Sequence, residues 1–388
     1  MTEKPRVLFL GSKEFPYGAN NGQDPIKSGG IETAVQTLAN ALASRTRLTI
    51  VTRDFQQPNS TNGVTIKKVP WLKGEFLRNP SFNASSFTAA LTQPCDLIHC
   101  HGLVAGLFGL IAGRLRNKPI VVTPHGIASG QPQYPAPLNA FLLALERLVY
   151  SRANATIFLS QGEKQRFANK SVFAKNPVII PLGIPLERFE RRANSFAASS
   201  FRQKNAVPQN ATVITFVGRL VKVKACDVLL KAFKKTRDKN TILLIVGDGP
   251  ERTALEKQAY ELDLGGRVRF LGHRSDLPAI MAATDVFVLP SHSEGLPSSM
   301  LEAMASHCAC IVTDIGLPVE NEVDVLVVKP GDAAALARAI TKLAKRPRLR
   351  EQLARKAFQK TVKTYGIQTT ARQHLQLYYS LLNRKPNR

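Results

Sequence analysis

The chain has 388 residues, 44% of them hydrophobic, with 53 basic and 28 acidic residues and a formal net charge of +25. This length exceeds one ordinary core and fits two domains, and the hydrophobic content excludes general disorder. No apolar run is long enough to span a bilayer, the N-terminus lacks a signal-peptide pattern, and the five cysteines show no zinc-type spacing. We therefore expect a cytoplasmic protein whose basic surface attracts an anionic partner.

Strand and helix patterns alternate through the first half of the chain. Apolar runs predict strands at residues 6–10, 48–52, 64–69, 119–123, 155–160 and 178–181. After the first strand, Gly29 and Gly30 precede a helical pattern that begins at Ile31. Glycines before a helix let the backbone approach an anion closely, so both are candidates for phosphate contact; an ordinary turn is the alternative.

An aromatic segment contains Trp71, Phe82 and Phe87 among several basic residues. Two interpretations remain open. The aromatic side chains cover the core of the first domain, or they contact an acceptor or a membrane surface.

Three histidines stand in or after predicted strands. Parallel α/β sheets place ligands at the carboxyl ends of their strands, which makes His125 and, with a weaker signal, His101 candidate site residues. We expect His99 and His101, which alternate along one strand, to reach different depths or contacts. Because no cysteine or carboxylate cluster completes a metal site around the histidines, no metal is expected.

The second half opens with a predicted strand at 213–217, followed by Gly218, Arg219 and then Lys224 at the start of a helix. A glycine turn with cations at a helix start predicts a phosphate cradle, in which Arg219 binds two oxygens and Lys224 acts as a point charge. Ordinary surface basicity is the alternative. Similar turns follow later strands, and their candidate residues are Gly247, His273 and Arg274.

The stretch from Pro290 to Ala305 carries two carboxylates. Glu294 lies in a loop after a buried strand, and Glu302 lies on a helix that is apolar on most sides and therefore largely buried. Between them the helix start, Pro297 to Ser299, offers free N–H groups and the positive end of the dipole. This order suits a ligand with hydroxyls at both ends and phosphate between them, which describes a nucleotide sugar.

The spacing of Glu294 and Glu302 resembles the E-x7-E motif of the family-4 (GT4) glycosyltransferases, which have the GT-B fold. Arg219 and Lys224 match the family's Gly-Arg-x4-Lys-Gly element, with Ala225 in place of the last glycine. The resemblance covers nearly the whole chain. It implies an α/β protein with two Rossmann-like doubly wound domains facing a central cleft: residues 1–190 on the acceptor side and 211–366 for the donor. The soft segment 191–210 is the expected linker, and helix 367–388 is expected to cross back onto the first domain.

The resemblance also implies the reaction, which is transfer of a sugar from a nucleotide-diphosphate-sugar donor to a glycan or lipid-linked acceptor, with retention of configuration. The donor acts as co-substrate, and no cofactor is expected. The implied catalytic residues are His125, Glu294, Arg219 and Lys224. The implied donor-binding residues are Gly29, Gly30, Arg219, Lys224, Glu294, Gly295, Leu296, Pro297, Ser298, Ser299 and Glu302, with His101, Gly247, His273 and Arg274 as weaker candidates.

Other functions fit parts of the pattern. A sugar-nucleotide epimerase or a phosphorylase of the same fold is one alternative, and a basic nucleic-acid-binding protein is another. Both halves share the excess charge and no recognition motif is present, so no nucleic-acid partner is expected. The basic segment 342–363 is either a solvated helical face or a contact with an anionic membrane, and the second case predicts peripheral membrane association.

Overall fold

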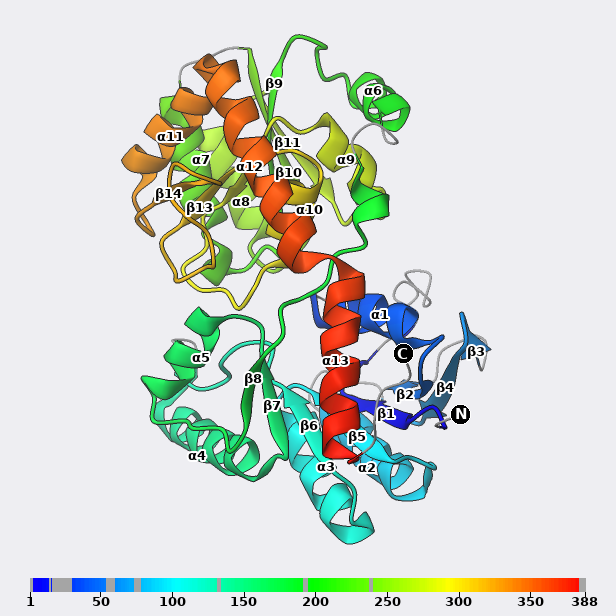
Figure 1. Cartoon of the computed structure of the whole chain (residues 1–388). Coiled ribbons are helices and arrows are strands. Elements are labelled where there is room, and N and C mark those ends of the chain that lie inside the picture. The colour runs from blue at the N-terminus through cyan, green and yellow to red at the C-terminus, as the bar shows by residue number, and fades with distance from the viewer. Residues whose placement is uncertain are drawn as a thin grey trace. The chain divides into compact units, whose positions relative to one another are not determined.

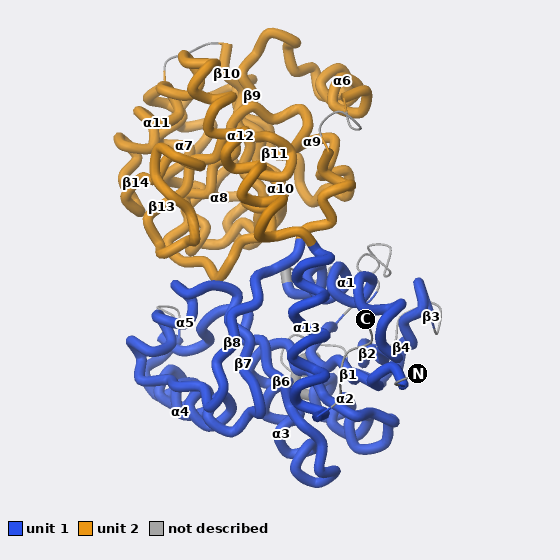
Figure 2. The backbone as a smooth tube through the Cα atoms, viewed as in Figure 1, with its two compact units in different colours: residues 1–183, 367–388 blue, residues 184–366 orange. Residues whose placement is uncertain are grey.

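The computed structural model describes residues 3–13, 15, 30–53, 60–72, 78–130, 134–190, 195–236 and 240–383. The chain divides into two compact units, each an α/β unit built on one sheet (Figures 1 and 2). Unit 1 comprises Met1–Gly183 and Ile367–Arg388, and unit 2 comprises Ile184–Gly366.

Unit 1 contains a sheet in the order β3-β4-β2-β1-β5-β6-β7-β8, in which only the short β3 pairs antiparallel among the described strands. Its strands are β1 (Arg6–Leu10), β2 (Arg47–Arg53), β3 (Ser60–Thr61), β4 (Val64–Val69), β5 (Leu97–His101), β6 (Ile120–Thr123), β7 (Ala155–Phe158) and β8 (Pro177–Ile179). Its helices are α1 (Gly30–Leu42), α2 (Arg78–Thr92), α3 (Leu103–Arg116), α4 (Ala136–Arg152), α5 (Gln161–Ala168) and α13 (Ile367–Leu381).

Both faces of the unit 1 sheet are buried, which explains why its strands read as continuous apolar runs. Successive side chains of a strand point to opposite faces. Val7 and Phe9 accordingly share a core with α1 and α13, while Leu8 and Leu10 share another with α2, α3 and α4.

The aromatic segment belongs to that second core. Phe82 is fully buried, and Trp71 and Phe87 pack against the same cluster from its edge. Of the two interpretations of this segment, the structure supports core packing.

Unit 2 contains an all-parallel sheet in the order β11-β10-β9-β12-β13-β14. Its strands are β9 (Thr212–Val217), β10 (Thr241–Val246), β11 (Val268–Gly272), β12 (Val286–Leu289), β13 (Ala309–Thr313) and β14 (Leu326–Val328). Its α-helices are α6 (Ser195–Lys204), α7 (Cys226–Lys235), α8 (Arg252–Glu261), α9 (Leu277–Ala283), α10 (Ser298–Ala305), α11 (Ala333–Lys345) and α12 (Pro347–Tyr365), and its 3-10 helices are η1 (Leu186–Phe189) and η2 (Lys222–Lys224). Chain order reverses beside β9, which makes its carboxyl end and that of β12 a topological switch point.

The boundary between the units differs from the expected one. It falls between residues 183 and 184, and the segment predicted as a linker contains α6. Ala198 and Phe201, three positions apart on α6, are buried, and the helix packs against α9. Arg202 adds hydrogen bonds to the Ala283 carbonyl at 2.9 Å and to Asp285 at 3.3 Å. The polar composition of this segment concealed an amphipathic helix, so the linker prediction at 191–210 was wrong.

Candidate active site

Glu294 lies at the carboxyl edge of the unit 2 sheet. Strand β12 ends at Leu289, and residues 290–297 form the loop that leads into α10. Pro297 has extended backbone angles (φ −72°, ψ 119°) and stands just before the helix, where its missing N–H costs nothing. Among the described residues no side chain caps the α10 N-terminus, so its first N–H groups remain available to a ligand.

The structure brings Glu294 together with Lys224, which comes from the turn after β9. Lys224 Nζ lies 2.5 Å from Glu294 Oε1, and these side chains are only 19% and 11% exposed. The buried Ser291 hydroxyl donates to the same oxygen at 2.6 Å. The His292 N–H also donates to the Val223 carbonyl at 2.8 Å, which joins the two loops. Ser291 was not predicted, although its position three residues before Glu294 in a tight loop was a usable signal.

Arg219 follows β9 and is exposed, and its guanidinium forms no ion pair or hydrogen bond with any residue that the structure describes. The turn that carries it packs tightly against the turn after β10. A Cβ on Gly247 would lie 1.9 Å from the Gly218 carbonyl oxygen, and one on Gly249 2.2 Å from that of Leu220. Gly247 also has φ +132°. The absence of a side chain at Gly247 therefore allows this close packing against the Arg219 turn. A role for Gly247 in donor binding stays a prediction.

Ala225 occupies a backbone conformation that favours glycine. Its φ of 50° and ψ of 40° are left-handed, and it joins η2 to α7. The family motif has glycine here, and the alanine adopts the same turn at a conformational cost of about 1 kcal/mol. The turn still presents Lys224 to Glu294.

Glu302 is on α10 and is 7% exposed. Burial raises the pKa of its carboxyl to about 7, and the nearby positive charge of Arg188 acts in the opposite direction. No described residue forms a hydrogen bond with this carboxylate. Arg188 belongs to η1, which packs against α10. Arg188 was not predicted from the sequence, because no local pattern around it indicates contact with a helix more than a hundred residues later.

The remaining unit 2 candidates are the loop and helix-start residues next to Glu294, together with His273 and Arg274 after β11. Gly295 to Pro297 complete the loop, and Ser298 and Ser299 are the first residues of α10. Arg274 binds Asp276 through two hydrogen bonds of 2.8 and 2.6 Å, so its guanidinium is engaged locally. His273 is exposed at the end of β11. A role for either in donor binding stays a prediction.

In unit 1 the structure pairs His101 with His125. His101 ends β5, His125 follows β6 with φ 58°, and His101 Nδ1 lies 3.0 Å from His125 Nε2. His99 and His101 were expected to reach different depths or contacts. Both are buried on one face of β5, because residues two apart in a strand share a face, and it is their contacts that differ. Their rings are 4.3 Å apart between centroids, although they bond different partners. Gly30 begins α1, and Gly29 lies outside the described residues.

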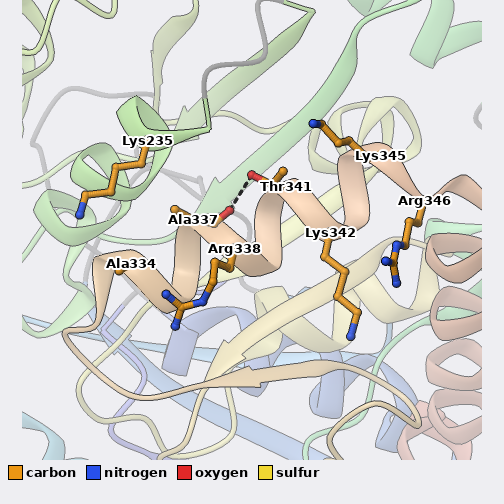
Figure 3. A pocket seen from close by; sticks show the side chains of 8 residues that line it. All are labelled: Lys235, Ala334, Ala337, Arg338, Thr341, Lys342, Lys345 and Arg346. Atoms are coloured by element: carbon orange, nitrogen blue, oxygen red, sulfur yellow. Dashed lines mark hydrogen bonds between the residues drawn. The ribbon is translucent and has the colours of Figure 1, made fainter.

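A groove of about 520 Å³ in unit 2 lies beside α11 and the end of α7. Five basic side chains line it, and none of the predicted donor-binding residues does. Figure 3 shows Lys345 and Lys342 pointing in opposite directions from α11, and Lys342 Nζ lies 2.6 Å from Glu322. The cations spread along the helix instead of converging on one point, as on a solvated helical face.

In the described part of the chain, no group of three or more histidine, cysteine or acidic side chains is arranged to hold a metal ion. None of the described helices has both the length and the apolar character of a bilayer-spanning segment.

Known families and relatives match this architecture. Residues 28–188 match the model of Glycosyltransferase Family 4, and residues 198–360 match that of Glycosyl transferases group 1. The chain is 32% identical over 297 residues to D-inositol 3-phosphate glycosyltransferase of Saccharomonospora viridis, covering 70% of this chain and 67% of the relative. It is 31% identical over 264 residues to the Escherichia coli UDP-Gal:alpha-D-GlcNAc-diphosphoundecaprenol alpha-1,3-galactosyltransferase, covering 64% and 66%. The matched part spans 61% of the length of a Bacillus subtilis relative.

Solved structures with little sequence identity share the fold. Anabaena HepE in complex with UDP and glucose superposes with a TM-score of 0.81 at 22% identity, covering 97% of this chain and 100% of that one. Sucrose-phosphate synthase from Thermosynechococcus elongatus gives 0.82 at 24% identity, covering 98% and 100%. These structures show the GT-B fold for the two units described above.

Proposed function

This chain belongs to glycosyltransferase family 4, and we propose that it moves a sugar from a nucleotide-diphosphate-sugar donor to a glycan or lipid-linked acceptor. Retention of the anomeric configuration is part of the proposal, carried over from the motif resemblance. The observation that carries it is the Glu302 carboxylate, which is buried and accepts no hydrogen bond from a described residue. Buried polar groups are normally hydrogen-bonded, so this carboxylate suits the hydroxyl groups of a ligand.

The cations near the start of α10 support a diphosphate between the two carboxylates. The Arg219 guanidinium bonds to no described residue, and no described side chain caps the N–H groups at the α10 N-terminus. Lys224 has three N–H donors, so its contact with Glu294 leaves two for phosphate oxygens. Negative charge grows on the diphosphate as the sugar leaves, and fixed positive groups stabilise that transition state.

In this proposal the two carboxylates accept hydrogen bonds from hydroxyl groups of the donor. Glu302 binds the ribose of the donor, and Glu294, oriented by Lys224 and Ser291, binds the donor sugar. A role for His125 near the reacting carbon of the sugar is carried over from the motif resemblance alone. UDP is a supported donor nucleotide, because HepE was solved with UDP-glucose and the E. coli relative is named for UDP-Gal.

A thermal-shift panel of UDP-, GDP- and ADP-sugars tests this function. A ligand that binds only the folded state raises its apparent stability by mass action, so one donor is expected to raise the Tm of the wild type. Glu302→Ala should abolish that shift. No shift with any donor, or an equal shift in the variant, would contradict the donor-site assignment. Donor incubated without acceptor separates the alternatives, because an epimerase converts it and a transferase leaves most of it intact.

We also propose that unit 1 docks on an anionic membrane through a surface that we call the α3–α4 face. It consists of Val104, Ile111 and Leu115 on α3 and Phe141 and Leu148 on α4, all large apolar side chains that are exposed. The spacings of four and seven residues place each set on one stripe of its helix, and the two helices pack together.

Charge supports an anionic bilayer as the occupant of the α3–α4 face. Residues 103–176 contain nine Lys and Arg against two acidic residues. Both acids, Glu146 and Glu163, are fully buried and accept backbone hydrogen bonds. The surface formed by this segment is therefore apolar and cationic, the combination that binds anionic lipid surfaces.

Exchanging Leu115 and Phe141 for serine is expected to weaken sedimentation with phosphatidylserine vesicles by roughly tenfold or more, because each loses most of its apolar transfer energy. Phe196→Ser, an 85% exposed side chain of unit 2, is the matched control and should bind like the wild type. Unchanged vesicle binding in the double variant, or self-association through this face, would overturn the docking proposal.

A further inference from the structure

Four histidines of unit 1 lie close together around His101. The His101 ring centroid lies 4.3 Å from that of His99 and 5.3 Å from that of His125, and the His99 ring lies 5.7 Å from that of His374. Burial lowers the pKa of all four, to about 4 for His125 and His374. At neutral pH each ring therefore carries one proton, on one of its two nitrogens.

Hydrogen bonds restrict where those protons can be. His374 Nδ1 lies 2.8 Å from the Thr370 carbonyl, which can only accept, so His374 carries its proton on Nδ1. His99 lies between two hydroxyls, Tyr378 at 2.7 Å and Thr123 at 2.8 Å, and is satisfied in either tautomer. His101 Nδ1 and His125 Nε2 lie 3.0 Å apart, so one of these nitrogens carries a proton and donates it in a hydrogen bond to the other.

The other nitrogen of His101 decides between the two arrangements. His101 Nε2 is buried and has no hydrogen-bond partner among the described residues. If His125 donated to His101, the His101 proton would be on Nε2 as a buried N–H without an acceptor. If His101 donates, Nε2 is a bare lone pair. An orphaned N–H is the rarer and costlier case, so donation by His101 is favoured.

The surroundings of Nε2 agree with a bare lone pair. His101 lines a cavity of about 20 Å³ whose other lining is mostly apolar and includes Leu38, Leu159 and Ile180. No carboxylate of the described chain lines it, so an N–H there would meet no charged acceptor. Phe9 packs edge-on against the His101 ring at 4.9 Å between centroids and limits its rotation.

The backbone that carries His125 is held as firmly as its ring. Glu163 of α5, fully buried, accepts the Gly126 N–H at 2.9 Å and the Leu159 N–H at 2.6 Å. These bonds tie the turn after β6 to the end of β7. The backbone next to His125 is therefore fixed, and the His125 ring is hydrogen-bonded to His101.

We propose that His101 is a positioning residue: it donates its Nδ1–H to Nε2 of His125 and so fixes His125 as the Nδ1–H tautomer. His125 then presents a hydrogen-bond donor, not an acceptor, to a hydroxyl oxygen of the donor sugar. The first statement rests on the geometry of unit 1, and the second also rests on the proposed function.

Histidine ring NMR on the ¹⁵N-labelled full-length protein tests the tautomer without any assay of activity. The wild type should show the proton of His125 on Nδ1. His101→Asn retains an amide N–H donor near the position of Nδ1 and should preserve this tautomer. His101→Leu, similar in volume but without a donor, should shift His125 toward the Nε2–H form. His374→Leu is the matched control, because His374 lines the same cavity without bonding His125, and it should leave the tautomer unchanged.

Slow hydrolysis by water of the donor found in the thermal-shift panel, measured without acceptor, supplies the second readout. His101→Leu should lower kcat roughly tenfold or more, as loss of an orienting partner does elsewhere, and His101→Asn should restore most of it. An Nε2–H tautomer of His125 in the wild type, or an unchanged one in His101→Leu, would overturn the role of His101. If the tautomers behave as expected but no sugar nucleotide is bound or turned over, the proposed function fails and the role of His101 in fixing the ring survives.

Discussion

Replacing Lys224 with methionine is expected to lower turnover roughly 1,000-fold, the upper end of the loss seen when one group that stabilises developing charge is removed. Lys224 acts twice in the proposed site. In the proposal it neutralises the departing diphosphate, and its ammonium, 2.5 Å from Glu294 Oε1, orients the carboxylate assigned to the donor sugar. Glu294 is only 11% exposed, so the variant should also lose about 2 kcal/mol of unfolding free energy as this carboxylate loses its charged partner. Steady-state kinetics and urea unfolding measure the two effects.

Variants of two neighbouring basic residues distinguish the effect of Lys224 on turnover from its effect on stability. Lys222 lies on the same 3-10 turn, is exposed and forms no ion pair with a described residue, so Lys222→Met should retain nearly full turnover. Arg219→Met should lower turnover roughly 100-fold with little change in unfolding free energy, because the described structure gives its guanidinium no partner. Turnover within threefold of the wild type in Lys224→Met would remove Lys224 from the diphosphate site.

The Glu302→Gln variant is expected to be more stable than the wild type at pH 8 and nearly equal to it at pH 4. Burial raises the pKa of Glu302 to about 7 in the folded state, against an ordinary value of 4.5. Between these values the folded state keeps a proton that the unfolded state has lost, so stability falls as pH rises through this window. The loss totals about 3 kcal/mol by pH 8, and glutamine, which stays neutral, avoids it.

The difference between the variant and the wild type must be measured, because other groups titrate in the same window. Burial lowers the pKa of His99, His101, His125 and His374, so their contribution to stability rises with pH up to the ordinary histidine value. That contribution is common to both proteins and cancels in the difference. A constant difference between pH 4 and pH 8 would show that the pKa of Glu302 is the same in the folded and unfolded states, and would contradict the rise that its burial causes.

Donor binding should lower the pKa of Glu302, which burial raises in the free protein. Ribose hydroxyls donate to the carboxylate and favour its ionised form, so the donor should release close to one proton on binding near pH 6. Calorimetry in buffers of different ionisation enthalpy measures this release, and Glu302→Gln should abolish it. The same substitution would therefore stabilise the fold and weaken the site, the usual trade-off at functional positions.

Helix α6 and the two histidines of β5 show where local sequence is a weak guide. Ser195–Lys204 has the alanine and serine content of a flexible segment, and only its contact with α9 reveals the apolar stripe formed by Ala198 and Phe201. The period of two in a β-strand places His99 and His101 on one face. Their separate partners, Tyr378 and His125, come from distant parts of the chain.

The amino-acid sequence alone determined the alternation of strands and helices, and it located Arg219, Lys224, Glu294 and Glu302 at strand ends and helix starts, because these features depend on spacings of a few residues. Only the tertiary structure decided that Lys224 donates a hydrogen bond to Glu294, 70 positions away, and that Glu302 is buried near Arg188. Burial and pairing arise from contacts between elements distant along the chain. The raised pKa of Glu302 follows from that burial, and no local pattern encodes it.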